Sequence, residues 1–224
     1  MKKDLCELVI IIDDSGSMQH VADKTISGFN EFLETHQKLP GEALLTLVKF
    51  NTNYEIVHNG VNIEDVPKLN KNTYQPHGMT ALLDAVGRSI DEVGKRYDAM
   101  SEEDRPAQVI FMIMTDGEEN SSEEYNLEQI KEKTKKRQDE NKWEFVFMGA
   151  DQNAWTAGHS MGLFQNVNYT VSDTHNVFAK AAYYSANSRM YSKEKSMKNF
   201  DLSDDDVKRG LNDLTKNQDN TPKS

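Results

Sequence analysis

The strongest constraint on the fold is an apolar run near the start of the chain that ends in small polar residues. Leu8 to Ile12 are all aliphatic, and the segment Asp13-Asp14-Ser15-Gly16-Ser17 follows directly. An almost entirely apolar strand is typical of the centre of a parallel sheet, where both faces are covered. Residues 7–13 are therefore predicted to form a central strand with polar side chains at its carboxyl end.

Apolar runs and helical patterns alternate along the chain, which indicates an α/β fold with helices on both faces of the sheet. Further strands are expected at residues 43–50, 54–58, 108–115, 143–148 and 167–171. A helix is expected after the first strand, and others at residues 80–98, 122–140, 154–162 and 174–192. Residues 51–53 are too short for a parallel crossover, so the strand after them must be antiparallel. Residues 60–78 show little periodicity and are expected to be a loop with one helical turn.

Two other polar segments lie where the chain leaves a strand or enters a helix. Gly78-Met79-Thr80 precedes a helical stretch, and Thr115-Asp116-Gly117 follows the apolar residues 109–114. In α/β sheets such positions gather along the carboxyl edge, where ligands bind. Carboxylate and hydroxyl oxygens, without sulfur or imidazole, suit a hard cation such as Mg²⁺ or Mn²⁺. The predicted metal ligands are Asp13, Ser15, Ser17, Thr80 and Asp116.

The spacing within the first segment fits this interpretation. In an extended chain, residues i, i+2 and i+4 point the same way, so Asp13, Ser15 and Ser17 can converge from one short segment. Gly16 allows the backbone to turn sharply after the strand. Because Mg²⁺ usually retains several water ligands, two or three protein oxygens are enough to hold it.

The three segments resemble the metal-ion-dependent adhesion site of von Willebrand factor A domains, a fold also called the integrin I domain. The likeness extends over residues 5–192. The chain is similar to small stand-alone bacterial and viral forms of the family, such as tellurite-resistance von Willebrand A proteins. The likeness implies a three-layer, Rossmann-like fold with a mostly parallel six-stranded sheet and one antiparallel strand. It also implies that Ser15 and Ser17 bind the metal directly, whereas Asp13, Thr80 and Asp116 bind directly or through water.

The resemblance implies a non-enzymatic module that binds a protein partner through the metal. Neutral hydroxyls leave much of the cation's charge uncancelled, so an open coordination position can accept a partner's acidic side chain. Mg²⁺ or Mn²⁺ is the expected cation, and Ca²⁺ is an alternative. The alternative function is a magnesium-dependent phosphohydrolase, which a resemblance to haloacid-dehalogenase-like enzymes would imply. Those enzymes have an Asp-x-Asp pattern, and in this sequence Ser15 stands in place of the second aspartate. A scaffold that has lost its partner site fits poorly with a complete set of five ligands.

Charge and composition indicate which partners and which cellular compartment to expect. The formal net charge of −11 disfavours non-specific binding to nucleic acid or anionic lipid. No stretch approaches the roughly 18 apolar residues of a membrane span, and no secretion signal is recognisable. The single cysteine, Cys6, excludes an intrachain disulfide. A cytoplasmic protein is therefore expected, and its oligomeric state stays open.

The composition divides the chain into two parts. Residues 1–195 are predicted to be the von Willebrand factor A domain, and residues 196–224 a polar tail. Within the tail, residues 204–214 can form a short helix capped by the preceding Ser-Asp-rich segment. Its apolar face, made by Val207, Leu211 and Leu214, is expected to pack on the chain's own domain, with docking of a partner as the alternative.

Other charged residues lie beside the predicted metal site. Asp14 is expected to be exposed. Glu118 and Glu119 are extra carboxylates that either raise cation affinity, repel an acidic ligand or simply face solvent. His77 precedes Thr80 and is expected to be exposed, with a place on the rim of the site as the alternative.

Overall fold

The computed structural model describes residues 1–150, 158, 160–161, 165–168, 173–190 and 203–216. In this part of the chain one sheet has the strand order β3-β2-β1-β4-β5-β6. All neighbouring strands are parallel except β2 and β3. The predicted α/β class with one antiparallel strand is therefore confirmed. The strands are β1 (Lys2–Asp13), β2 (Glu42–Phe50), β3 (Tyr54–Asn62), β4 (Pro106–Thr115), β5 (Glu144–Gly149) and β6 (Gln165–Asn168).

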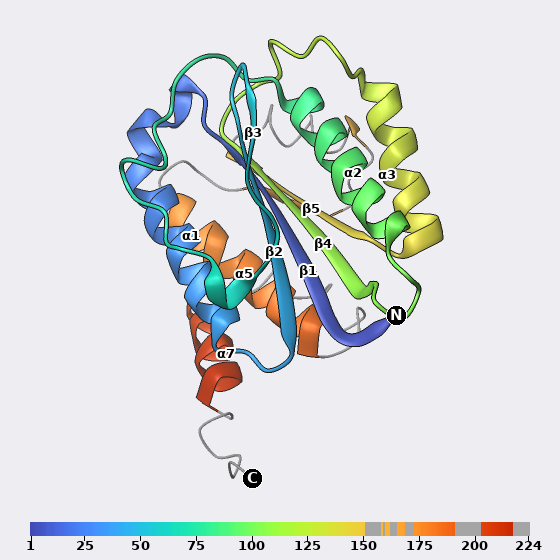
Figure 1. Ribbon diagram of the computed structural model, residues 1–224. Helices are drawn as coiled ribbons and strands as arrows, with labels where there is room; N and C mark the ends of the chain where they lie inside the picture. Colours follow the sequence, from blue (N-terminus) through green and yellow to red (C-terminus); the bar gives the residue numbers. More distant parts are fainter. Residues whose placement is uncertain (151–157, 159, 162–164, 169–172, 191–202, 217–224) are drawn as a thin grey trace.

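Helices cover both faces of the sheet (Figure 1). A 3₁₀ turn, η1 (Gly16–Val21), leads from β1 into α1 (Ala22–Gln37), which packs beside α5 (Thr174–Met190) on one face. The other face is covered by α2 (Leu82–Ala99) and α3 (Leu127–Asn141). The side chains of β1 alternate between the two cores: Leu8, Ile10 and Ile12 join the first, and Val9 and Ile11 join the second. This double burial explains why the run is apolar throughout.

The tail contains the helix α7 (Asp204–Lys216), which packs against α5. Val207 is buried, and Leu211 packs against the core on the side of α1 and α5. A Cβ on Gly210 would lie 2.3 Å from the ring of Tyr183, so the two helices approach each other closely at this glycine. The apolar face of α7 is therefore occupied by the chain's own α5.

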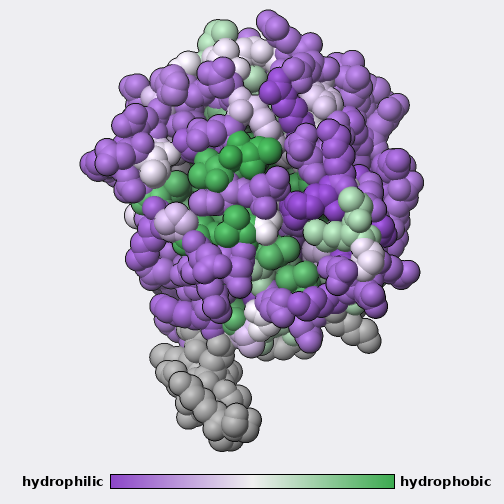
Figure 2. All heavy atoms as spheres, in the orientation of Figure 1, coloured by the Kyte–Doolittle hydropathy of each residue, from purple (hydrophilic) through white to green (hydrophobic). Residues whose placement is uncertain are grey.

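The prediction that the antiparallel strand ends before Gly60 is wrong, because β3 continues to Asn62. Gly60 has a φ of +63°, which side-chain-bearing residues rarely adopt, and the β2–β3 register shifts between Leu45 and Val48. The strand thus passes through a bulge and ends in η2 (Ile63–Asp65), the expected single turn. Figure 2 shows apolar side chains gathered over β2 and β3 among hydrophilic neighbours.

Two helix predictions need comment. The helix expected from residue 122 begins at Leu127, where Asn126 and Gln129 form a reciprocal capping box. The helix expected at residues 154–162 and the second half of the strand expected at 167–171 lie largely outside the described residues. Among the described helices, none is long and apolar enough to cross a membrane.

Candidate functional site

The five predicted ligands come from three segments that meet at the carboxyl edge of the sheet, the upper end in Figure 1. β1 and β4 are neighbours, with Ile12 opposite Met114, so the two strands end side by side. Asp13 is the last residue of β1, and Asp116 directly follows β4. Thr80 lies just before α2 and approaches the same place from the covering layer.

Hydrogen bonds link four of the five residues. The backbone amide of Ser15 donates to Asp13 Oδ1 at 2.8 Å, and the hydroxyls of Ser15 and Ser17 lie 3.1 Å apart. The Ser17 hydroxyl donates to Asp116 Oδ1 at 2.7 Å. The first and third segments are therefore in direct contact.

The fifth residue, Thr80, joins the group across Gly117. A Cβ placed on Gly117 would lie 3.3 Å from Thr80 Oγ1, 3.4 Å from Ser17 Oγ and 3.9 Å from Asp13 Oδ2. Oxygens from the first two segments thus surround a position beside Gly117 of the third segment, and this position is free of a side chain only because residue 117 is glycine. The structure brings all five predicted residues together.

The site has a buried floor and an open side. Asp13, Ser15 and Thr80 are buried, whereas Ser17 is exposed and Asp116 is partly exposed. Burial raises the pKa of Asp13 to about 6, although hydrogen bonds from Thr115 and Ser15 oppose the shift. A carboxylate in such a position is stabilised by a nearby positive charge.

Two residues that the sequence did not single out position Asp13. The Thr115 hydroxyl donates to Asp13 Oδ2 at 2.5 Å, and the Tyr74 hydroxyl donates to the Asp13 carbonyl oxygen at 2.6 Å. Thr115 directly precedes Asp116, so its position in the Thr115-Asp116-Gly117 segment could have indicated that it supports the site. Tyr74 lies in a segment without periodicity, and its contact depends on how that segment packs.

Thr80 is fixed through its backbone. Its amide donates to Asn120 Oδ1 at 2.9 Å, and the Asn120 amide donates to the Thr80 carbonyl oxygen at 3.1 Å. The Gly16 amide also donates to the Gly78 carbonyl oxygen at 3.1 Å. These bonds join the three site segments independently of the side chains that face the site.

Glu119 has a structural role that the sequence interpretation missed. Its Oε2 accepts a hydrogen bond from the Leu83 amide at 2.8 Å, and its Oε1 accepts one from the Ser122 amide at 2.8 Å. Asp84 in turn accepts hydrogen bonds from the amides of residues 123–125. The loop after Asp116 is therefore built onto the start of α2, which explains why α3 begins later than expected.

The expectation that Asp14 is exposed is wrong, because only 5% of its surface is accessible. Its Oδ2 lies 3.9 Å from the Nζ of Lys49. Burial is the main cause that raises the pKa of Asp14. His77 is exposed, as expected, and its backbone amide donates to the Asp14 carbonyl oxygen at 2.8 Å.

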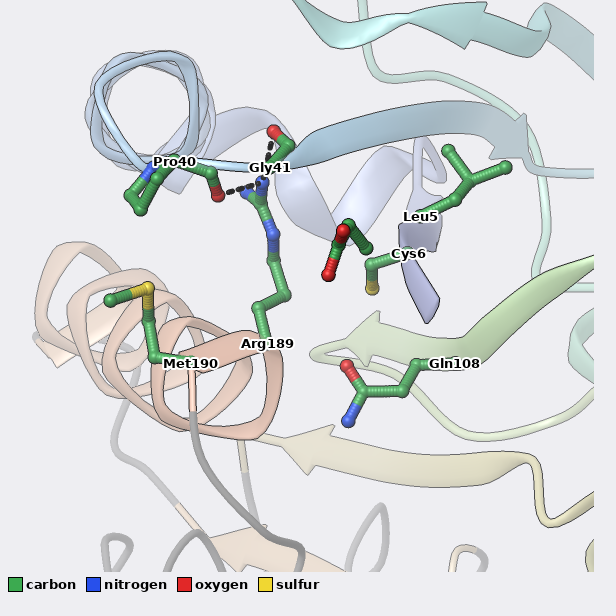
Figure 3. Close-up of a pocket in the computed structure, with 8 residues that line it drawn as sticks. Leu5, Cys6, Pro40, Gly41, Gln108, Arg189 and Met190 are labelled. Carbon is green, nitrogen blue, oxygen red and sulfur yellow. Dashed lines mark hydrogen bonds between the residues drawn. The ribbon is translucent and has the colours of Figure 1, made fainter. Parts of the chain in front are cut away.

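A cavity of about 360 Å³ lies at the opposite, amino-terminal edge of the sheet (Figure 3). Arg189 at its wall donates hydrogen bonds to the carbonyl oxygens of Pro40 and Gly41 and to His36, so its donors are directed at the protein itself. Burial raises the pKa of the Cys6 thiol in this wall to about 12. That thiol is protonated at neutral pH and is a poor nucleophile or metal ligand.

The fold and the oxygen-lined edge define a Rossmann-like α/β domain with a candidate cation site. The family model for the von Willebrand factor type A domain matches residues 7–183, and the chain belongs to this family. A comparison with curated proteins gave no match.

Several solved structures share the fold. Proximal thread matrix protein 1 from the mussel byssus, with a zinc-occupied metal-ion-dependent adhesion site, has a TM-score of 0.54 and 13% identity, covering 78% of this chain and 46% of that one. The D319A mutant of the PilB minor pilin from Streptococcus sanguinis has a TM-score of 0.56 and 10% identity, covering 88% and 62%. Manganese-loaded TRAP protein from Plasmodium vivax has a TM-score of 0.51 and 17% identity, covering 81% and 74%. The chain thus spans less than half the length of the mussel protein, and these likenesses concern the fold alone.

Proposed function

We propose that this protein is a metal-dependent protein-binding module that holds a divalent cation at the carboxyl edge of its sheet. The observation that carries the proposal is the convergence of oxygens of Asp13, Ser17 and Thr80 around the empty side of Gly117, with Asp116 joined to this group through Ser17. The proposed ligands are Asp13, Ser15, Ser17, Thr80 and Asp116.

The residues fit a hard divalent cation in donor type and in charge. Every donor is an oxygen, and the two carboxylates can balance a charge of +2. Buried Asp13, with its raised pKa, is a group that a cation would stabilise in its charged form. Mg²⁺ or Mn²⁺ is the cation we expect, with Ca²⁺ as an alternative. The mussel and Plasmodium structures, which hold zinc and manganese, support the divalent class without deciding between metals.

The open side of the site supports a role in recognition. Ser17 and Asp116 face outward, so a coordination position on that side is accessible to a partner. An aspartate or glutamate of a protein partner would complete the coordination at that position. We therefore propose an acidic side chain as the group that the bound metal recognises.

A magnesium-dependent phosphohydrolase is the competing function. Ser15 stands where that class has its second aspartate, and a neutral hydroxyl cannot supply the charge of that carboxylate. A binding role without catalysis is therefore the proposal. An assay with p-nitrophenyl phosphate and Mg²⁺ should show no turnover above the rate in buffer, and turnover that disappears in Asp13→Asn would favour the enzyme.

Thermal unfolding with each of Mg²⁺, Mn²⁺, Ca²⁺ and Zn²⁺ tests the metal site. Binding to the folded state should raise the melting temperature as the metal concentration increases. The corresponding gain in the free energy of unfolding is about 2.7 kcal/mol at a metal concentration of one hundred times the Kd. No response to millimolar Mg²⁺ or Mn²⁺ would contradict the site.

Capture of partners with and without chelator then tests recognition, because binding through the metal should be lost with chelator and restored by added cation.

A further inference from the structure

A second polar cavity, of about 260 Å³, lies beside the proposed metal site. Asp13 and Asp14 are consecutive residues at the end of β1, so their side chains leave the strand on opposite sides. Asp13 faces the hydroxyl cluster, whereas Asp14 lines this cavity. One short segment therefore contributes to two different sites. The cavity is lined by Asp14, Lys49, Asn51, Asn53, Glu55, Asn72, Thr73, Gln75 and His77.

The buried carboxylate of Asp14 lacks hydrogen-bond donors. Only 5% of Asp14 is accessible, and within the described part of the chain its Oδ1 has no hydrogen-bond partner. The Nζ of Lys49 lies 3.9 Å from Asp14 Oδ2 but only 3.0 Å from Glu55 Oε2. One ammonium group is thus shared by two carboxylates, which leaves the cavity with a net negative charge and a buried acceptor that a donor would stabilise.

His77 forms another part of the wall. Its Nδ1 lies 2.8 Å from the Gln75 carbonyl oxygen, a contact that assigns the proton of the neutral ring to Nδ1. The other ring nitrogen, Nε2, is then an acceptor, and it lies 3.5 Å from the Nδ2 of Asn51. Both ring nitrogens of His77 thus have partners within the protein, and the carboxylates that reach the cavity come from the end of β1 and from β3.

We propose that this cavity binds a cationic side chain of a protein partner, specifically an arginine guanidinium. A guanidinium carries five N–H donors in a planar fork, which suits acceptors that come from several directions. The cavity itself binds the cation whether or not metal is present. The link to a protein partner rests on the proposed function: the metal would take an acidic residue of that partner while this cavity takes a basic one.

NMR titration of the whole protein with argininamide tests the proposal, first with chelator and then with Mg²⁺. Saturable shifts of the backbone amides of Asn51, Asn53 and His77 are expected, with a Kd in the millimolar range. Citrullinamide, which replaces the guanidinium with a neutral urea group of similar shape, should cause no saturable shift. Lysinamide should bind at least threefold more weakly, because its ammonium has fewer donors; equal binding would overturn the choice of guanidinium.

Variants locate the binding. Asp14→Asn should weaken argininamide at least tenfold, and Glu55→Gln, which changes an exposed residue and spares the fold, at least threefold. Asp139→Asn, which removes an exposed carboxylate of α3, is the matched control and should leave the Kd unchanged. Equal binding in all three variants, shifts that never saturate, or equal shifts with citrullinamide would overturn the proposal and leave the cavity as a water site. Binding that persists with chelator supports the cavity even where the metal titration fails.

Discussion

The hydroxyl of Thr115 donates a hydrogen bond of 2.5 Å to Oδ2 of Asp13, and this bond ties the end of β4 to the end of β1. Both residues are fully buried. The Thr115 hydroxyl also accepts a hydrogen bond of 3.1 Å from the Gly117 amide. Thr115 therefore positions both the innermost carboxylate of the site and the glycine that leaves room for the proposed cation.

Replacing Thr115 by valine, which has nearly the same shape, should lower both the stability of the protein and its response to metal. The Asp13 carboxylate would lose a buried donor, so the free energy of unfolding should fall by about 1–3 kcal/mol and the metal-dependent rise in melting temperature should shrink. Thr115→Ser keeps the hydroxyl and should retain most of the metal response. Denaturant unfolding with and without Mn²⁺ measures both effects, and a valine variant with an unchanged metal response would show that Asp13 needs no such support.

Gly117→Ala should abolish metal binding without unfolding the protein. The added methyl group would sit 3.3 Å from Thr80 Oγ1 and 3.4 Å from Ser17 Oγ, in the space that we assign to the cation. Gly16→Ala is the matched control, because its methyl group would meet only the Gly78 carbonyl oxygen, at 3.4 Å. Isothermal calorimetry should show loss of Mn²⁺ binding in the first variant alone. Equal binding in the two would place the cation elsewhere.

Ser15→Ala, Thr80→Ala and Asp116→Ala should each weaken the metal response while the metal-free melting temperature changes little. Thr80 is fixed by backbone bonds to Asn120, and Asp116 is partly exposed, so the fold does not depend on these side chains. Ser27→Ala, on the exposed face of α1, serves as the control and should respond to metal like the unmodified protein. Variants that unfold before metal is added would indicate that these residues are structural caps.

Glu119→Gln should destabilise the protein even without metal. A glutamine places an N–H₂ group where the carboxylate now accepts bonds from the amides of Leu83 and Ser122, so the free energy of unfolding should drop by about 1–3 kcal/mol. Glu103→Gln, an exposed change outside the site, should stay within about 0.5 kcal/mol. Chemical denaturation compares them. Glu119 thus has a structural role in addition to the roles that the sequence left open.

Acid should destabilise the protein through His36. This ring is buried, and its Nε2 lies 2.7 Å from the Ser185 hydroxyl, while its Nδ1 lies 2.9 Å from the Nη1 of Arg189. Burial, followed by the charge of Arg189, holds the pKa of His36 well below its ordinary value of 6.5. Below that pH the unfolded chain binds a proton that the folded protein excludes, so stability is lost as pH falls through 6.5.

The slope from His36 should approach, and not exceed, about 1.4 kcal/mol per pH unit below pH 6.5, because one proton is involved. Urea unfolding at several pH values measures it. His36→Gln should lower stability at pH 7 and flatten this part of the pH profile, whereas His175→Gln, at a partly exposed position, should leave the slope from His36 in place. An unchanged slope in His36→Gln would assign the acid sensitivity to other groups.

The sequence predicts the sheet well where burial alone decides the pattern. The apolar run of β1 follows from its position between two helical layers, and three polar segments at strand and helix ends predicted which five residues would meet. It fails where a residue's role depends on partners distant in sequence. Asp14 is buried by the packing of Lys49 and the segment around His77, and no local pattern reports that. Whether the assembled oxygens hold a cation remains a prediction.

The bulge in β3 has a consequence for the behaviour of the protein at high concentration. β3 is an outer strand, and apolar side chains gather over it and β2 (Figure 2). A regular outer strand with such a surface is a template onto which another extended chain can pair, which leads to aggregation. The left-handed turn at Gly60 and the shifted register interrupt the row of amides and carbonyls that such pairing would need. The bulge thus shortens the stretch of regular edge on β3 that another extended chain could pair with.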